Sequence, residues 1–214
     1  MNQFKQGGLK AVCVKKWLFV LILSILFLSA TTSNSYCDTE GLNQEETAEY
    51  LNEFGIYSGW ASGKLKYFQG DYETVPLHFQ IGFDITSLLN DINIHPPGRL
   101  KFLFEPFINT VLQPDANVEV GNNFMLKYTH PIIQQFSLFI EGGLGLLYTT
   151  QHTYEQGTQF NFSQQIGGGI SYQFAENKAI NFGYRRRHFS NCDIDEPNAG
   201  IDMDYFLFGV SIFY

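Results

Sequence analysis

The sequence predicts an all-β fold, an eight-stranded antiparallel transmembrane β-barrel. Three observations favour this fold. Eight segments of roughly ten residues or more alternate between apolar and polar side chains, with turn-forming residues between them, which is typical of membrane-crossing strands. Only 16% of the residues are charged, whereas 16% are aromatic and 20 residues are Gly, so much of the surface need not face water. Aromatic residues gather at the segment ends, as in the girdles of a barrel.

Each predicted strand carries its apolar residues on one face. In the sixth, Phe160, Phe162 and Ile166 alternate with Asn161 and Gln165. Successive side chains of a strand point to opposite faces, so each strand has an apolar face and a face rich in Gly, Gln, Asn and Ser. The predicted strands are Phe54–Gly63, Val75–Ile85, Leu100–Thr110, Asn117–Tyr128, Phe136–Tyr148, Gln159–Phe174, Ala179–Asn191 and Ile201–Tyr214.

A water-soluble β-barrel or sandwich is the alternative fold, because its strands alternate in the same way around an apolar core. The membrane is favoured because the segments are long enough to cross a bilayer at the tilt of a barrel. The polar face also carries charges such as Glu141, which suit a narrow polar interior. In lipid, a closed barrel is the only sheet that satisfies all its backbone hydrogen bonds.

The N-terminal part of the chain predicts export from the cytoplasm. Lys15 and Lys16 precede the apolar run WLFVLILSILFLSA, whose 14 residues are few for a transmembrane helix. A basic start and a short apolar stretch describe a secretory signal peptide at 1–35, with an uncleaved anchor helix as the alternative. The polar, acidic segment 36–53 is then a periplasmic lead-in, and 54–214 form the barrel.

Charge and cysteine content argue against several other classes. The net charge of -8 disfavours a general nucleic-acid binder. No CxxC motif and no paired His spacing are present, so neither a metal ion nor another cofactor is expected. Cys13 would leave with the signal peptide, and the residues before Cys37 are unlike those of a lipoprotein. On the barrel model Cys37 and Cys192 fall at opposite membrane faces, which argues against a disulfide.

Residues suited to chemistry gather in one stretch, Phe182 to Asp202. His188 and Ser190 are two residues apart in a predicted strand, so both side chains point the same way, and Asn191 follows directly. A turn-rich link then leads to Asp202. A base, a nucleophile and an acid in this arrangement suit a Ser-His-acid triad, which is recognised by geometry rather than by chain order. Asp204 has the same parity as Asp202 and is the alternative acid.

The parity of the last two strands predicts which face these residues occupy. An even number of strands places both ends of the barrel chain in the periplasm, so the link at 192–200 faces outside. His188 shares its parity with the apolar residue Phe182, and Asp202 shares its parity with Phe206. The candidate triad is therefore predicted to point toward lipid near the outer leaflet, not into the barrel.

The segments FGYRRRHFSN at 182–191 and PNAGID at 197–202, with the N-terminal signal and the aromatic C-terminus, resemble the PagL-type outer-membrane lipid A 3-O-deacylases. The match is specific over Asn181–Tyr205, and the rest of the chain matches as an eight-stranded pattern. The resemblance implies a barrel in the bacterial outer membrane with an active site facing the outer leaflet. It implies hydrolysis of the ester at the 3-position of lipid A, the lipid of lipopolysaccharide, with release of a 3-hydroxyacyl chain.

The resemblance also implies roles for single residues. His188 matches the base of the family, Ser190 its nucleophile and Asp202 its acid, although the acid of the family is usually Glu. Asn191 and Asn198 match amides that contribute to the oxyanion hole. The arginines at 185–187 have two interpretations. In one, their positive charges balance Glu119 and Glu141 in the barrel interior. The other turns Arg186 outward, where its guanidinium could pair with a lipid A phosphate.

Two other functions remain compatible with the sequence. One is a structural or adhesive outer-membrane barrel without catalysis, and the other is a secreted soluble β-barrel that binds an apolar ligand. A homodimer is compatible with each of these functions.

Overall fold

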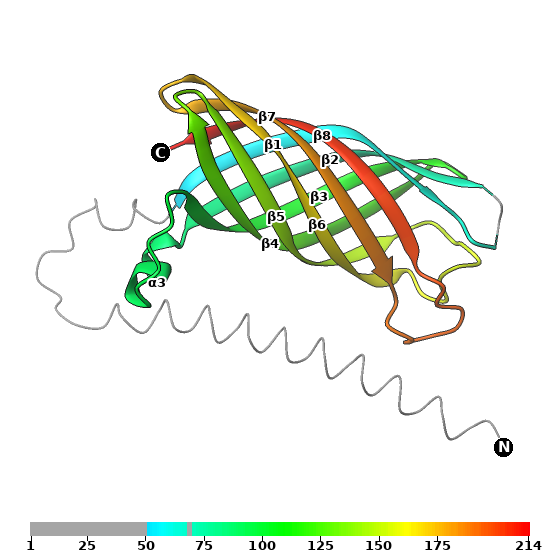
Figure 1. Cartoon of the computed structure of the whole chain (residues 1–214). Coiled ribbons are helices and arrows are strands. Elements are labelled where there is room, and N and C mark those ends of the chain that lie inside the picture. The colour runs from blue at the N-terminus through cyan, green and yellow to red at the C-terminus, as the bar shows by residue number, and fades with distance from the viewer. Residues whose placement is uncertain (1–50, 68–69) are drawn as a thin grey trace, which may run out of the picture.

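The computed structural model describes residues 51–67 and 70–214, which form a closed antiparallel β-barrel (Figure 1). Each strand pairs with the next along the chain, and β8 closes the barrel against β1. The predicted eight-stranded barrel is thus confirmed. No helix in the described part of the chain is long and apolar enough to span a bilayer. The strands are β1 (Leu51–Lys64), β2 (Asp71–Asp84), β3 (Arg99–Gln113), β4 (Asn117–Ile133), β5 (Phe136–Thr149), β6 (Phe160–Ala175), β7 (Lys178–Ser190) and β8 (Ile201–Phe213).

Several strands extend beyond their predicted ends. β2 begins at Asp71 rather than Val75, and β4 continues to Ile133 rather than ending at Tyr128. The added residues continue the backbone ladder, since Asp71 pairs with Lys64 of β1. Strand ends that project beyond the lipid need not alternate in polarity, so the hydrophobic pattern does not reveal them.

The two ends of the barrel differ. β1 begins and β8 ends side by side at one end, which is the periplasmic end of a barrel with an even number of strands. That end also carries a short helix that the sequence pattern did not predict, α3 (Thr86–Asp91), between β2 and β3 (Figure 1). The loops that follow β1, β5 and β7 lie at the opposite, outer end.

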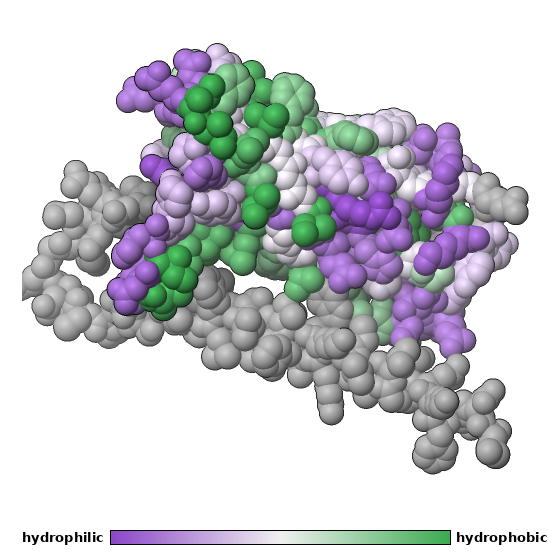
Figure 2. All heavy atoms as spheres, viewed as in Figure 1, coloured by the Kyte–Doolittle hydropathy of each residue, from purple (hydrophilic) through white to green (hydrophobic). Residues whose placement is uncertain are grey.

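The wall of the barrel faces outward with the apolar residues predicted for it. Phe182 is 61% exposed and Phe206 is 62% exposed. Aromatic rings pair across β7 and β8, with 4.9 Å between the centroids of Phe182 and Phe208. Figure 2 shows green, apolar spheres over much of the wall, with purple, polar spheres at both ends and in a patch on the wall. Exposure of such an apolar surface to water would be unfavourable, whereas the acyl chains of a membrane solvate it well.

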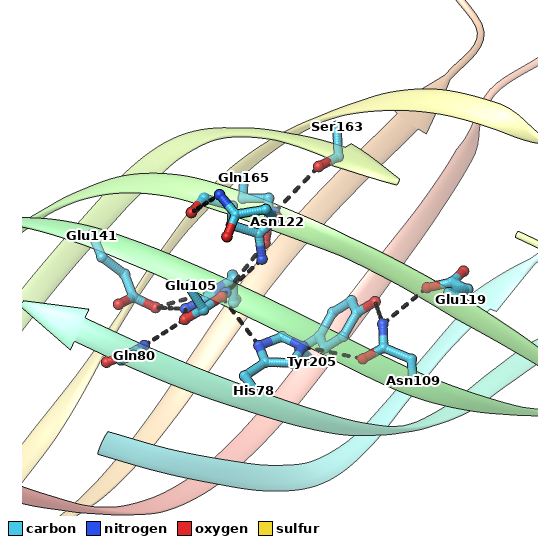
Figure 3. A network of polar contacts seen from close by, with 12 residues as sticks. His78, Gln80, Glu105, Asn109, Glu119, Asn122, Glu141, Ser163, Gln165 and Tyr205 are labelled. Atoms are coloured by element: carbon cyan, nitrogen blue, oxygen red, sulfur yellow. Dashed lines mark hydrogen bonds and ion pairs between the residues drawn. The ribbon is translucent and has the colours of Figure 1, made fainter. Parts of the chain in front are cut away.

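Charged and polar side chains fill the interior (Figure 3). Glu105 is fully buried and accepts hydrogen bonds from Arg185, at 2.6 and 3.1 Å, and from Gln80 at 2.6 Å. Arg185 also lies 2.8 Å from Glu141. Arg187 donates to Glu119 at 2.8 Å. Arg185 and Arg187 therefore point inward, as one interpretation of the sequence predicted.

Buried interior charges are balanced in sign among the described residues. The carboxylates of Glu53, Glu105, Glu119 and Glu141 face the cations of Lys101, Lys127, Arg185 and Arg187. Buried charges are tolerated when they are paired and hydrogen-bonded. The interior is therefore a packed polar core rather than an open pore.

Some predictions fall outside the described residues. These are the signal peptide at 1–35, nearly all of the lead-in at 36–53, and the placements of Cys13 and Cys37. Cys192 is described and is buried. β1 begins at Leu51, three residues before the predicted start of the barrel at Phe54.

Candidate active site at the outer rim

His188 and Asp202 form a hydrogen-bonded pair on the wall near the outer end. They are direct cross-strand partners in the register of β7 and β8. His188 Nδ1 lies 2.7 Å from Asp202 Oδ1. Their side chains are 34% and 46% exposed, unlike those of Arg185 and Arg187, which are buried inside the barrel. Both residues therefore point outward, as their parity predicted, and the second ring nitrogen, Nε2, is left for another partner.

Ser190 is the last residue of β7 and pairs with Phe162 of β6. It lies two residues after His188 on the same strand, so its side chain leaves the same face of the sheet. No hydrogen bond joins Ser190 to His188 among the residues that the structure describes. Catalytic hydrogen bonds are often formed only when substrate is bound, so the arrangement is compatible with a serine-histidine pair.

Gly200 packs directly against the imidazole ring of His188. A Cβ atom at this position would lie 2.5 Å from Cε1 and 2.9 Å from Nε2 of the ring. Gly200 also has a φ of +69°, a left-handed conformation that residues with a side chain rarely adopt. The backbone at Gly200 thus limits where the imidazole can lie. The sequence identified Gly200 only as part of a turn.

The two candidate acids have different partners. Asp202 contacts His188, whereas Asp204 accepts hydrogen bonds from Arg186 Nη1, at 2.9 and 3.1 Å, and from the hydroxyl of Tyr184 at 2.5 Å. The side chain of Arg186 is 52% exposed and lies on the outer face. The geometry favours Asp202 as the partner of the histidine and gives Asp204 to the arginine.

The two asparagines of the site hold the β7–β8 loop together. Asn191 is fully buried, and its Nδ2 donates to the carbonyl oxygens of Asp195 and Pro197, at 2.9 and 3.2 Å. Its backbone N–H donates to Asn198 Oδ1 at 3.0 Å. The Nδ2 of Asn198 donates to Asp193 at 2.6 Å. The side-chain amide of Asn191 is therefore engaged within the loop, whereas Asn198 is partly exposed.

A second loop, between β5 and β6, docks on the β7–β8 loop. Gln156 Oε1 accepts the backbone N–H of Asn191 at 3.1 Å. The backbone oxygen of Glu155 accepts the N–H of Ala199 at 2.8 Å, and the N–H of Gly157 donates to Pro197 at 2.6 Å. Glu155 is fully buried. No local pattern in the sequence indicates this contact, because it joins two separate loops of the chain.

The outer end of the barrel also carries a shallow, open hollow of about 520 Å³. It opens beside the β7–β8 loop and is lined by Tyr67, Asp193, Glu196, Pro197 and Asn198. In the part of the chain that the structure describes, no three His, Cys, Asp or Glu side chains are grouped so that they could hold a metal ion.

Comparisons with solved structures show the same fold. The crystal structure of the outer membrane enzyme PagL aligns with a TM-score of 0.51 at 19% identity, over 73% of this chain and 97% of that chain. Neisserial surface protein A (NspA) aligns with a TM-score of 0.54 at 14% identity, over 75% of this chain and 97% of that chain. No sequence among the curated proteins matches the chain.

A family model matches most of the barrel. The sequence model described as lipid A 3-O-deacylase (PagL) covers residues 66–211, a range that includes β2 to β7, most of β8 and the paired His188 and Asp202. The resemblance inferred from the segment at 182–202 is thereby confirmed, as is the location in the bacterial outer membrane. The chain therefore belongs to the PagL family of lipid A 3-O-deacylases and is an outer-membrane lipid A deacylase.

Proposed function

We propose that this protein hydrolyses the 3-O-linked ester of lipid A in the outer leaflet with a Ser190-His188-Asp202 triad. The observation that carries the proposal is the 2.7 Å hydrogen bond between His188 and Asp202 on the outward face of the wall. A site on this face meets lipid directly, so the acyl chains need no deep pocket because the bilayer already solvates them.

The proposed reaction follows from the geometry of the pair. Asp202 accepts the Nδ1 proton of His188 and so keeps Nε2 unprotonated and able to accept a proton. Nε2 takes the proton of the Ser190 hydroxyl as its oxygen attacks the ester carbonyl. The tetrahedral intermediate collapses, and the imidazolium returns the proton to the 3-oxygen of lipid A, which leaves as the alcohol. A water molecule then hydrolyses the acyl-serine by the same steps and releases the 3-hydroxy fatty acid.

The oxyanion of the tetrahedral intermediate requires hydrogen-bond donors. Asn198 fits this role, because it is partly exposed and, among the residues that the structure describes, its Nδ2 donates one hydrogen bond, to Asp193. The loss of one such donor typically lowers kcat by roughly 10²- to 10³-fold. Asn191 contributes indirectly in this proposal, since its amide fixes the loop that carries Asn198.

Arg186 is the proposed contact for a phosphate group of lipid A. Its guanidinium is exposed on the same outward face as His188, and its bonds to Asp204 use Nη1 alone. A guanidinium carries five N–H donors, so the donors that do not bind Asp204 can pair with a phosphate. We also propose that a signal peptide at 1–35 and a periplasmic lead-in precede the catalytic barrel, whose first strand begins at Leu51 rather than at Phe54.

Mass spectrometry of lipid A from Gram-negative cells that express the protein tests the proposal. We expect the wild type to remove one 3-hydroxyacyl chain and Ser190→Ala to remove none. Ser58→Ala is the matched control, because Ser58 is an exposed serine on β1 that is level with Phe208 and Phe182 rather than with His188. Heat-dependent migration on gels reports whether each barrel is folded.

Two results would contradict the proposal. Equal trimming by Ser190→Ala and the wild type would exclude the serine as nucleophile. A folded wild type that leaves every lipid A chain in place would favour a barrel without catalysis.

A further inference from the structure

The connection between β2 and β3 carries an amphipathic helix at the periplasmic end. In and beside α3, the apolar residues Ile85, Leu88, Leu89 and Ile92 recur at the spacing of one helical face. Polar residues occupy the other face, and Ser87 lies opposite the apolar one. Connections at the periplasmic end of such barrels are usually short turns, so this longer segment is unusual.

Part of the apolar face of α3 is exposed in the described part of the protein, although Ile85, just before the helix, is buried. Ile92 is 63% exposed, Ile94 is 50% exposed and Leu88 is 37% exposed, and α3 has no buried residue. Green and purple spheres lie side by side in Figure 2 where α3 lies in Figure 1. Neighbouring exposed apolar residues of this kind usually mark a surface that contacts a membrane or another protein.

The apolar face continues the lipid-facing surface of the barrel. Phe79, Ile81 and Phe83 form the outward-facing row of β2 that leads to the helix, and the next residue of the same parity, Ile85, is buried where the helix begins. Hydrogen bonds fix the start of the helix to the first residues of β3. The N–H of Ile85 donates to the carbonyl of Leu100 at 2.9 Å, and the N–H of Leu100 donates to Thr86 Oγ1 at 2.9 Å. The helix therefore leaves the wall at the level where the lipid-facing band ends.

We propose that α3 and Ile94 insert into the inner, phospholipid leaflet of the outer membrane as an interfacial anchor. Such helices lie in the membrane plane with the apolar face at the boundary between headgroups and acyl chains. Between residues 85 and 98, Asp91 is the only Asp, Glu, Lys or Arg in the sequence. Attraction to anionic headgroups therefore does not drive this contact, and the burial of apolar area does.

Tryptophan fluorescence in vesicles tests this contact. Trp17 and Trp60 are replaced by Phe, and Ile92→Trp places the reporter on the apolar face. Ser87→Trp is the matched control on the opposite face. The purified full chain is folded into phosphatidylcholine vesicles, with or without lipids brominated near the top of their acyl chains. Gel migration reports that each variant is folded.

We expect a blue-shifted emission from Ile92→Trp that brominated lipids quench, with little quenching of Ser87→Trp. Quenching is expected to persist at high salt, because the contact is apolar. Water-like emission from Ile92→Trp without quenching would overturn the proposal. A blue shift without quenching would assign the face to a second copy of the chain. Equal quenching of both variants would contradict the assignment of faces.

Discussion

At the scale of single residues, the register of β7 and β8 explains how an aspartate reaches the histidine. The family usually has Glu at the position of Asp202, which is one methylene longer. Residues directly opposite on antiparallel strands have Cβ atoms about 5 Å apart. His188 and Asp202 are such a pair, so the shorter carboxylate spans the distance and forms a 2.7 Å hydrogen bond.

Replacement of Asp202 by Asn is expected to reduce deacylation by roughly 10²- to 10⁴-fold, because an amide no longer holds the required tautomer of His188. Asp204→Asn is the control, since Asp204 pairs with Arg186 and Tyr184 instead. Initial rates on purified lipid A in mixed micelles measure both variants. A larger loss for Asp204→Asn than for Asp202→Asn would give the acid role to Asp204.

Replacement of Gly200 by Ala is expected to lower kcat at least tenfold while the barrel remains folded. The new methyl group would meet the His188 ring at 2.5 Å and would require a strained positive φ. Gly142→Ala is the control, because the nearest atom to its Cβ is 3.5 Å away. The idea fails if Gly200→Ala keeps full activity.

The sequence predicts the face of each site residue but not its neighbours. Alternation with a period of two places His188, Ser190 and Asp202 outward and Arg185 and Arg187 inward, and the structure agrees. The approach of Gly200 to the imidazole depends on the path of a loop, which has no periodicity. That contact is therefore visible only in three dimensions.

At the scale of elements, the β5–β6 and β7–β8 loops form one unit over the site. Gln156 binds the backbone of Asn191, the residue that follows Ser190, and also forms an isolated backbone bridge with Asn198. Lys66 from the β1–β2 loop donates to the carbonyl of Ala199, next to Gly200. Two neighbouring loops thus hold the segment of the β7–β8 loop that packs on His188.

Gln156→Ala is expected to lower kcat by about tenfold with little change in KM, because it loosens the loop that orients the catalytic groups without touching the bound lipid. His152→Ala is the control in the same loop, where His152 contacts Gln159. Initial rates at varied mole fractions of lipid A separate kcat from KM. A change in KM alone would show that the loop binds substrate rather than positioning the site.

The strands were predictable and the helix was not, for a physical reason. A strand in a membrane wall has to alternate, and all eight therefore appear in the sequence. α3 spans only six residues, and its apolar positions are too few to distinguish a helix from a loop. Contacts between loops depend on side chains such as Gln156, which no local pattern indicates.

At the scale of the whole molecule, the charges of the interior stabilise the barrel only when each has its partner, because a buried charge without a partner is costly. The sequence predicts that interior arginines oppose Glu119 and Glu141, and both pairs are present. It does not single out Glu105, which accepts bonds from Arg185, Gln80 and Asn123 at the centre of the network. Parity selects the interior residues, whereas their pairing depends on how the closed barrel brings distant strands together.

Glu105→Leu is expected to destabilise the barrel by about 3–5 kcal/mol, because Arg185 loses one of its two carboxylate partners and two amides lose an acceptor. Asp71→Asn removes the exposed partner of Lys64 and should cost less than about 1 kcal/mol. Urea unfolding in detergent micelles, followed by tryptophan fluorescence, compares the two. Similar free energies of unfolding would show that the interior pairs add nothing.

The outward position of His188 and Asp202 also determines what counts as substrate concentration. A site on the wall of a barrel meets molecules that diffuse sideways in the same leaflet, not molecules dissolved in water. The encounter rate then depends on the fraction of the leaflet area that lipid A occupies and on how fast it moves there. For this deacylase, the crowding and fluidity of the outer leaflet therefore set the encounter rate, as the concentration of dissolved substrate does for a soluble esterase.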